Sequence, residues 1–68
     1  MKTKIIYPNI AAEMGRCRFT QKELATRLGI SNISLHYRLY GKVEWKLEEM
    51  IKLSNIFGKD INYLISKI

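Results

Sequence analysis

Apolar residues along this chain recur at intervals of three and four, which is the spacing of helices that bury one face. No stretch shows the alternation that is typical of a strand, so the pattern predicts an all-α chain of five short helices. The first helix covers residues 8–16 and opens on Pro8, whose missing N–H costs nothing at a helix start. The positions that mark the first, fourth and fifth helices are Ile10, Ala11 and Met14; Leu47, Met50, Ser54 and Phe57; and Ile61, Leu64, Ile65 and Ile68.

The second and third predicted helices lie close together around a glycine turn. Thr20 and Glu23 have the spacing of a capping box, in which each side chain accepts a hydrogen bond from the other residue's backbone N–H. Gly29 ends that helix, and Ser31 caps the next one two residues later. Two short helices joined in this way predict a helix-turn-helix unit over residues 20–40. Their inner faces carry Leu24, Ala25 and Leu28 in the second helix and Leu35 and Leu39 in the third.

The fourth predicted helix follows Trp45, which occupies the position of a hydrophobic staple. Glu48 and Glu49 fall in its first turn, where the helix dipole favours anions. Because adjacent residues on a helix point apart, both carboxylates are interpreted as helix-start charges. Gly58 ends this helix, and Asp60 caps the last one.

Charge is concentrated in the centre of the chain. The 68 residues suffice for one domain, 1–68, and carry a net charge of +6. Of this, net +5 falls within residues 16–42, whereas residues 43–68 are neutral. The excess indicates an anionic partner, with chance clustering in a small basic protein as the alternative. The basic residues of the central window are Arg16, Arg18, Lys22, Arg27, Arg38 and Lys42.

Other chemistry is not indicated. The single cysteine, Cys17, suits a reducing compartment, and with His36 it lacks the ligand spacing of a zinc site. Ser34 and His36 are two apart on a helix and point in different directions, so they form no catalytic dyad. Apolar runs are too short to cross a membrane or serve as a secretory signal. We therefore expect a soluble, cytoplasmic domain that is not an enzyme, with residues 1–7 as an extended arm or a tail.

The third predicted helix presents an unusual outer face. With 100° per residue, Leu35 and Leu39 face the core, and Ser31 and Arg38 lie at its edge. The opposite side contains no carboxylate, although a solvated helix normally exposes Glu or Lys. Neutral donors and acceptors with one apolar side chain suit a face that reads the major groove of DNA. These outward residues are Asn32, Ile33, His36, Tyr37 and Tyr40.

Residues 20–31 (TQKELATRLGIS) resemble the helix-turn-helix core of the lambda-repressor-like family, also called the Cro/repressor or Xre family. The resemblance continues through Leu35 and residues 41–50 and ends near Ile65, so it covers most of the chain without an insertion. Residues 9–14 and 38–42 are similar to a subgroup from phages and prophages of low-GC Gram-positive bacteria. The family implies a compact five-helix domain that binds double-stranded DNA.

By this resemblance, Asn32, Ile33 and Tyr37 contact bases, with His36 beside them. Asn32 suits the N6 and N7 atoms of adenine, and Ile33 suits a thymine methyl group. A protein contact is the alternative for Ile33, and phosphate contacts are the alternative for Tyr37 and His36. Gln21 would hold a phosphate at a helix N-terminus, with ordinary first-turn polarity as the alternative. The further phosphate-contacting candidates are Ser31, Ser34, Tyr40, Lys42, Arg16 and Arg18.

Some positions depart from the family pattern. Arg38 stands where many members have an apolar aromatic residue. Leu39 and Tyr40 replace a common Glu-Asn pair, so the family's buried pairing of that Glu with an arginine of the first helix is absent. Lys46 replaces the usual Ser or Thr cap of the fourth helix, at a cost of about 1 kcal/mol. The transfer of roles is therefore weakest at residues 38–40.

Together these features predict a sequence-specific, double-stranded DNA-binding transcriptional regulator. One helix-turn-helix buries a modest area, so we expect a homodimer on a two-fold site, paired through Ile65 and Ile68 or through the arm at residues 1–7. The alternative is a protein-interaction module on the same fold (an antirepressor, adaptor or antitoxin), because exposed Ile33, Tyr37 and Tyr40 suit an interface. No cofactor, metal, membrane or small-molecule substrate is expected.

Overall fold

The structure, a computed structural model, describes residues 5–67. These residues form five α-helices and no strand, which confirms the predicted all-α class. The first helix runs one residue beyond its predicted end, and the capping residues predicted for the second, third and fifth lie where expected. The helices are α1 (Pro8–Cys17), α2 (Gln21–Leu28), α3 (Asn32–Leu39), α4 (Leu47–Phe57) and α5 (Ile61–Leu64).

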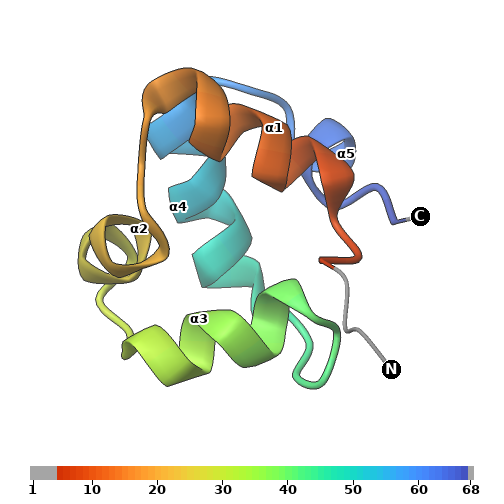
Figure 1. Cartoon of the computed structure of the whole chain (residues 1–68). Helices are drawn as coiled ribbons and strands as arrows, with labels where there is room; N and C mark the ends of the chain where they lie inside the picture. Colours follow the sequence, from red (N-terminus) through yellow and green to blue (C-terminus); the bar gives the residue numbers. More distant parts are fainter. Residues whose placement is uncertain (1–4, 68) are drawn as a thin grey trace.

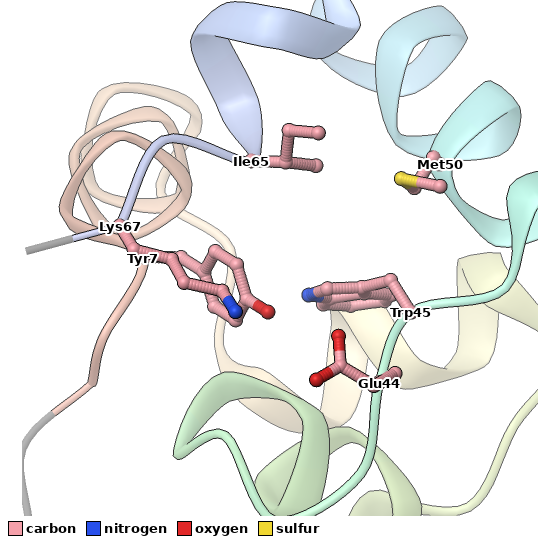
Figure 2. Close-up of a pocket in the computed structure, with 6 residues that line it drawn as sticks. All are labelled: Tyr7, Glu44, Trp45, Met50, Ile65 and Lys67. Atoms are coloured by element: carbon pink, nitrogen blue, oxygen red, sulfur yellow. The ribbon is translucent and has the colours of Figure 1, made fainter.

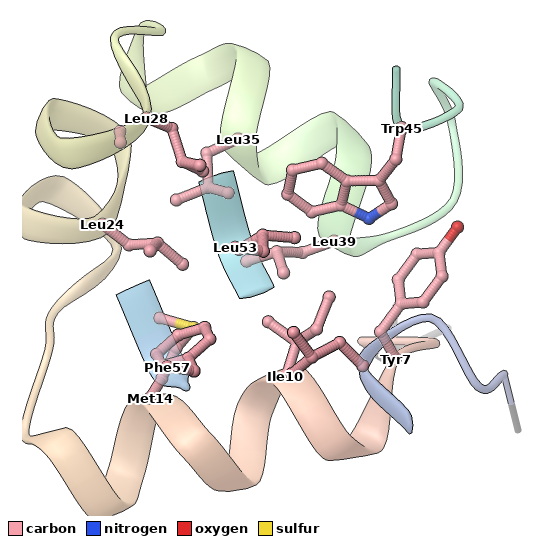
Figure 3. Packing of buried hydrophobic residues seen from close by; sticks show 12 residues of the cluster. Tyr7, Ile10, Met14, Leu24, Leu28, Leu35, Leu39, Trp45, Leu53 and Phe57 are labelled. Atoms are coloured by element: carbon pink, nitrogen blue, oxygen red, sulfur yellow. The ribbon is translucent and has the colours of Figure 1, made fainter. Parts of the chain in front are cut away.

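α4 runs through the middle of the molecule, with α1, α2 and α3 around it and α5 beside α1 and α4 (Figure 1). Their apolar side chains meet in a single core (Figure 3). Leu24 of α2, Leu35 of α3 and Leu53 of α4 are completely buried there. Because α3 enters this core only through its inner face, its outer face is left to solvent.

The inner face of α4 differs from the prediction. Leu47, expected on that face, is 66% exposed, and Met50 and Ser54 are only partly covered. The residues of α4 that face the core are instead spaced by four and begin at Glu49. Hydrophobic periodicity could not predict this position, because Glu49 is charged. The buried residues of α4 are Glu49, Leu53 and Phe57.

The last helix is shorter than its apolar pattern suggested. α5 ends at Leu64, and Ile65 is the residue that follows it. The Ile65 side chain is partly buried and packs against the core, and its role as a dimer contact stays a prediction. Ile68, the other residue of that predicted surface, lies outside the described residues.

Residues 5–7 pack against the end of α3 rather than forming an arm. The Ile6 N–H donates to the Leu39 carbonyl oxygen (3.0 Å), and Tyr7 is buried with its ring edge-on to Trp45. Gly41, at φ +80°, lies so close that an added Cβ would be 2.5 Å from Ile6 Cδ1. Residues 5–7 therefore do not form the predicted arm or tail, because their apolar side chains pack against the core. Residues 1–4 of that prediction lie outside the described residues.

Candidate nucleic-acid interface

The turn between α2 and α3 is built from local hydrogen bonds. The capping box is confirmed, since the Glu23 N–H donates to Thr20 Oγ1 (3.1 Å) and the Thr20 N–H donates to Glu23 Oε1 (2.9 Å). Gly29 ends α2 at φ +75°, a left-handed conformation that favours glycine. The Ile30 N–H then donates to the Ala25 carbonyl oxygen (3.0 Å), which completes the turn. α3 therefore starts in a direction that the sequence of the turn dictates.

The start of α3 is held by two serine hydroxyls. Ser31 Oγ accepts from the Ser34 N–H (3.0 Å) and donates to Ser34 Oγ (2.9 Å). The predicted cap is thus confirmed. Both hydroxyls were also phosphate candidates, and they lie together at the N-terminal end of α3, where backbone N–H groups favour an anion.

The outer face of α3 collects the four predicted base-contacting residues. Asn32, Ile33, His36 and Tyr37 are all exposed, Ile33 by 66% and Tyr37 by 42%. The sequence of α3 contains no Asp or Glu. The face is therefore neutral, polar and partly apolar, as its sequence predicts.

Tyr40 does not belong to this face. It is the C-cap residue of α3, is only partly exposed and packs against the core. Its ring lies 4.3 Å from the ring of His36, measured between centroids. The helical wheel placed Tyr40 outward because it assumed regular helix geometry one residue too far. The Tyr40 ring instead packs against the His36 ring.

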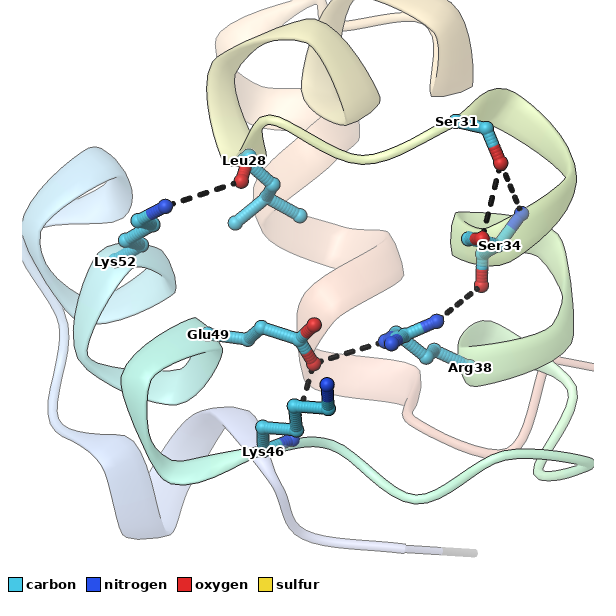
Figure 4. A network of polar contacts seen from close by, with 7 residues as sticks. All are labelled: Leu28, Ser31, Ser34, Arg38, Lys46, Glu49 and Lys52. Atoms are coloured by element: carbon cyan, nitrogen blue, oxygen red, sulfur yellow. Dashed lines mark hydrogen bonds and ion pairs between the residues drawn. The ribbon is translucent and has the colours of Figure 1, made fainter.

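An ion pair that the sequence did not predict joins α3 to α4. Arg38 Nε donates to Glu49 Oε1 (2.8 Å), and Arg38 Nη1 donates to the Ser34 carbonyl oxygen (3.1 Å; Figure 4). Glu49 Oε1 also accepts from the Lys46 N–H (3.0 Å). Glu49 therefore caps α4 from its third position, while the Lys46 ammonium, which has no lone pair, caps nothing.

The environment of Glu49 favours its charged form. Burial is the largest single influence and raises its pKa, but the hydrogen bonds from Arg38 and from the Lys46 backbone outweigh it together, so the pKa lies below the ordinary value. The buried carboxylate thus stays ionised beside a buried guanidinium. The only hint in the sequence was that Arg38 falls at the edge of the core-facing side of its helix.

Arg16, one of the predicted phosphate candidates, is engaged by contacts within the protein. Its Nε pairs with Glu13 Oε1 (2.6 Å), and its Nη2 donates to the Phe57 carbonyl oxygen at the end of α4 (3.4 Å). Glu13 also accepts from the hydroxyl of Tyr63 (3.0 Å), which belongs to α5. Arg16 thus links α1 to α4, and Glu13 links α1 to α5. The hydrogen bond that Arg16 donates is the main reason that the pKa of Glu13 lies below its ordinary value.

The remaining phosphate candidates lie next to the two helices. Gln21 is the first residue of α2, and Arg18 is exposed in the turn before it. Lys42 follows α3, with its Nζ 5.8 Å from the ring centroid of Tyr37. Since Arg16 and Arg38 are held in ion pairs with glutamates, the basic residues of the central window that face solvent without such a pair are Arg18, Lys22, Arg27 and Lys42.

The arrangement is a helix-turn-helix whose second helix exposes a carboxylate-free face between basic residues, which defines a DNA-binding module. Over residues 5–67, no cluster of three metal-ligating side chains occurs. In the same part of the chain, no helix combines the length and apolarity that crossing a membrane requires.

Comparison with known proteins agrees with this class. A family model described as helix-turn-helix matches residues 10–64, from α1 to the end of α5. The chain belongs to this family of Cro/C1-type DNA-binding regulators, and its five-helix lambda-repressor-like fold is confirmed. Searches of curated proteins and of solved structures gave no significant match.

Proposed function

We propose that the protein is a sequence-specific transcriptional regulator, Cro- or repressor-like, that places α3 in the major groove of double-stranded DNA. The observation that carries this proposal is the division of α3 into two faces. Leu35 and Leu39 are fully buried, whereas Asn32 and Ile33 are exposed at the end of the helix that leads into a groove. The similarity of residues 9–14 and 38–42 to phage and prophage regulators supports a phage or prophage role.

In this proposal each outer residue of α3 has a chemical role. The Asn32 amide both donates and accepts, so it matches the N6 and N7 atoms of adenine. Ile33 packs on a thymine methyl group, and Tyr37 and His36 donate to base edges or phosphates. The stacked ring of Tyr40 restricts His36, which favours a fixed contact.

Phosphate contacts come from both ends of the two helices. Gln21 and the N-terminal N–H groups of α2 bind one phosphate, and Lys42 and Arg18 bind others at the flanks. Ser34 donates its hydroxyl hydrogen to a phosphate, and Ser31 does the same when its O–H turns away from Ser34 Oγ. Arg16 is left out of this set, because Glu13 already neutralises it.

We further propose that two copies act together on a two-fold site. Half-sites would be about 34–36 Å apart, one turn of the DNA helix. Since Ile65 is partly covered by the core, a more accessible surface is offered by Leu47 and Ile51, exposed by 66% and 46% and one turn apart on α4. Sedimentation of the chain and of a Leu47→Ser, Ile51→Ser variant tests this surface, because only the native chain should dimerise.

The decisive experiment is selection of bound sites from random duplex DNA. A regulator of this kind enriches a short motif in two inverted copies. With 6–10 phosphate contacts, the affinity for the selected site should fall by about 10³- to 10⁵-fold between about 50 and 200 mM salt. A random pool after selection, or an affinity without salt dependence, would contradict the proposal.

The second candidate function is a protein-interaction module, favoured by the 66% exposure of Ile33. Here the outer face of α3 would dock on a protein, as in an antirepressor, adaptor or antitoxin. An Arg18→Ala, Lys42→Ala variant separates the two functions, because a DNA reader loses affinity with those phosphate contacts and a docking face does not.

A further inference from the structure

A pocket of about 230 Å³ lies away from the outer face of α3, between the N-terminal segment, the start of α4 and the chain after α5 (Figure 2). One side of it is apolar, and the other side carries one acidic and one basic side chain. Its lining residues are Tyr7, Glu44, Trp45, Met50, Ile65 and Lys67.

The indole N–H of Trp45 points into this pocket without a partner. Trp45 is only 8% exposed, and its Nε1 atom is inaccessible to solvent. Among residues 5–67, no acceptor forms a hydrogen bond with it. Figure 2 shows the nitrogen on the edge of the ring that faces Tyr7, with Ile65 and Met50 above the space between the two rings. Buried donors are almost always paired, so the pocket is suited to an acceptor.

The residues that line the pocket also indicate the polarity, charge and size of a ligand that would fit it. Met50 and Ile65 offer apolar surface, which an alkyl or ring group covers best. Glu44 and Lys67 carry opposite charges at the polar end, so neither a cation nor an anion is favoured there. The volume is below the roughly 300 Å³ at which drug-sized sites begin, so only a small molecule fits.

We propose that this pocket binds a small, neutral, amphipathic molecule whose apolar group lies between Met50 and Ile65. Its carbonyl oxygen accepts from the Trp45 N–H after a shift of the Trp45 or Tyr7 ring uncovers the Nε1 atom, which is covered in this structure. An amide head group meets the site fully, because its NH₂ donates to Glu44 while its oxygen faces Trp45. This site goes beyond DNA binding and does not depend on it. It also extends the sequence-based expectation, which included no small molecule.

Two hydrogen-bonded connections lead from the pocket to α3. Tyr7 follows Ile6, whose N–H donates to the carbonyl oxygen of Leu39 at the end of α3. Trp45 precedes Lys46, whose N–H donates to Glu49, the ion-pair partner of Arg38. A ligand that moves Tyr7 and Trp45 therefore displaces the two segments that anchor α3.

The test uses the full chain without DNA and reads the indole ¹H–¹⁵N resonance, which is unique because Trp45 is the single tryptophan. Hexanamide is the probe, and hexylammonium, which has the same chain but no acceptor, is the control. We expect a saturable shift with hexanamide and a dissociation constant of about 1 mM, which is what a ligand of this size normally reaches. The backbone resonances of Leu39 and Glu49 should shift with the same midpoint.

Two variants sharpen the result. Trp45→Phe keeps a ring but removes the donor, and we expect it to weaken hexanamide binding, read at the Met50 methyl group, at least about tenfold. Asn55→Ala, on the exposed face of α4, should bind as the native chain does. If Trp45→Phe does not fold, the comparison of the two probes on the native chain decides alone.

Three outcomes would overturn the proposal: no indole shift at about 10 mM hexanamide, ten times the expected dissociation constant, equal shifts with both probes, or unchanged affinity in Trp45→Phe. An indole shift without any change at Leu39 and Glu49 would establish the pocket and overturn its connection to α3. None of these outcomes depends on whether the protein binds DNA.

Discussion

Arg38 of α3 and Glu49 of α4 form an ion pair, 2.8 Å from Nε to Oε1, in which both side chains are about nine-tenths buried. The pair connects the inner face of α3 to the first turn of the central helix α4 (Figure 4). Its carboxylate also closes the start of α4 through the Lys46 N–H. One side chain thus fixes both the position of α3 and the beginning of α4.

Removing one partner of this pair should be costly. We expect Glu49→Ala to lower the free energy of unfolding by about 3 kcal/mol, because Arg38 keeps a buried charge without its partner. Replacing both residues, as Arg38→Met with Glu49→Leu, should leave the stability within about 1 kcal/mol of the native chain. Urea denaturation measures both. Glu48→Ala is the matched control, since Glu48 is exposed in the same turn, and an equal loss in that variant would contradict a special role for the pair.

Acid should destabilise the protein through three glutamates. The pKa of Glu13 lies below its ordinary value chiefly because of Arg16, and that of Glu23 chiefly because of the Thr20 N–H. The pKa of Glu49 is also lowered, although burial opposes this. Since the folded state favours the charged carboxylates, their contribution is fully present above the ordinary pKa of about 4.3 and is lost as the pH falls through the lower folded-state values.

Thermal unfolding between pH 7 and pH 2 measures this dependence. The melting temperature should stay nearly constant down to about pH 5 and then decrease. Glu49→Gln should start from a lower melting temperature and lose less of it on acidification, because one of the three groups no longer titrates. A parallel decrease in both proteins would show that Glu49 is not among the groups responsible.

Two glycines should respond to alanine in opposite directions. Gly41→Ala places a Cβ 2.5 Å from Ile6 Cδ1 at φ +80°, so we expect a loss of about 2 kcal/mol. Gly15 lies inside α1 with nothing within 4 Å of its Cβ position, so Gly15→Ala should gain about 0.5 kcal/mol. Combining Gly41→Ala with Ile6→Ala should recover the steric part of the loss only. The packing of residues 5–7 on α3 would be refuted if Gly41→Ala were neutral.

Base and phosphate contacts should differ in how they depend on sequence. On a selected duplex, Asn32→Ala should cost about 1–3 kcal/mol and relax the preference at one base pair. Lys42→Ala should weaken binding to all sequences alike. It should also make the plot of log binding constant against log salt concentration less steep by about one unit of slope. Titrations of the matched and substituted duplexes at several salt concentrations separate these effects. Uniform weakening by Asn32→Ala would remove it from the base-contacting set.

The sequence by itself determined the local structure of this protein. The caps at Thr20 and Ser31 and the glycine at position 29 act within a few residues of themselves, so their spacing sufficed to predict where α2 begins and ends and where α3 begins. The exposed face of α3 followed from the same helical period, except at Tyr40, where the helix had already ended.

Only the tertiary structure decided which of these elements meet. The pairing of Arg38 with Glu49, the attachment of Arg16 to Phe57, and the packing of Ile6 on Gly41 depend on how helices cross and where the chain returns. Hydrophobic periodicity does not record such pairings, because a buried charge becomes acceptable only when a distant residue supplies its partner. Of the basic residues at positions 16–42, two are therefore held in ion pairs within the fold. The others are exposed cations beside α2 and α3.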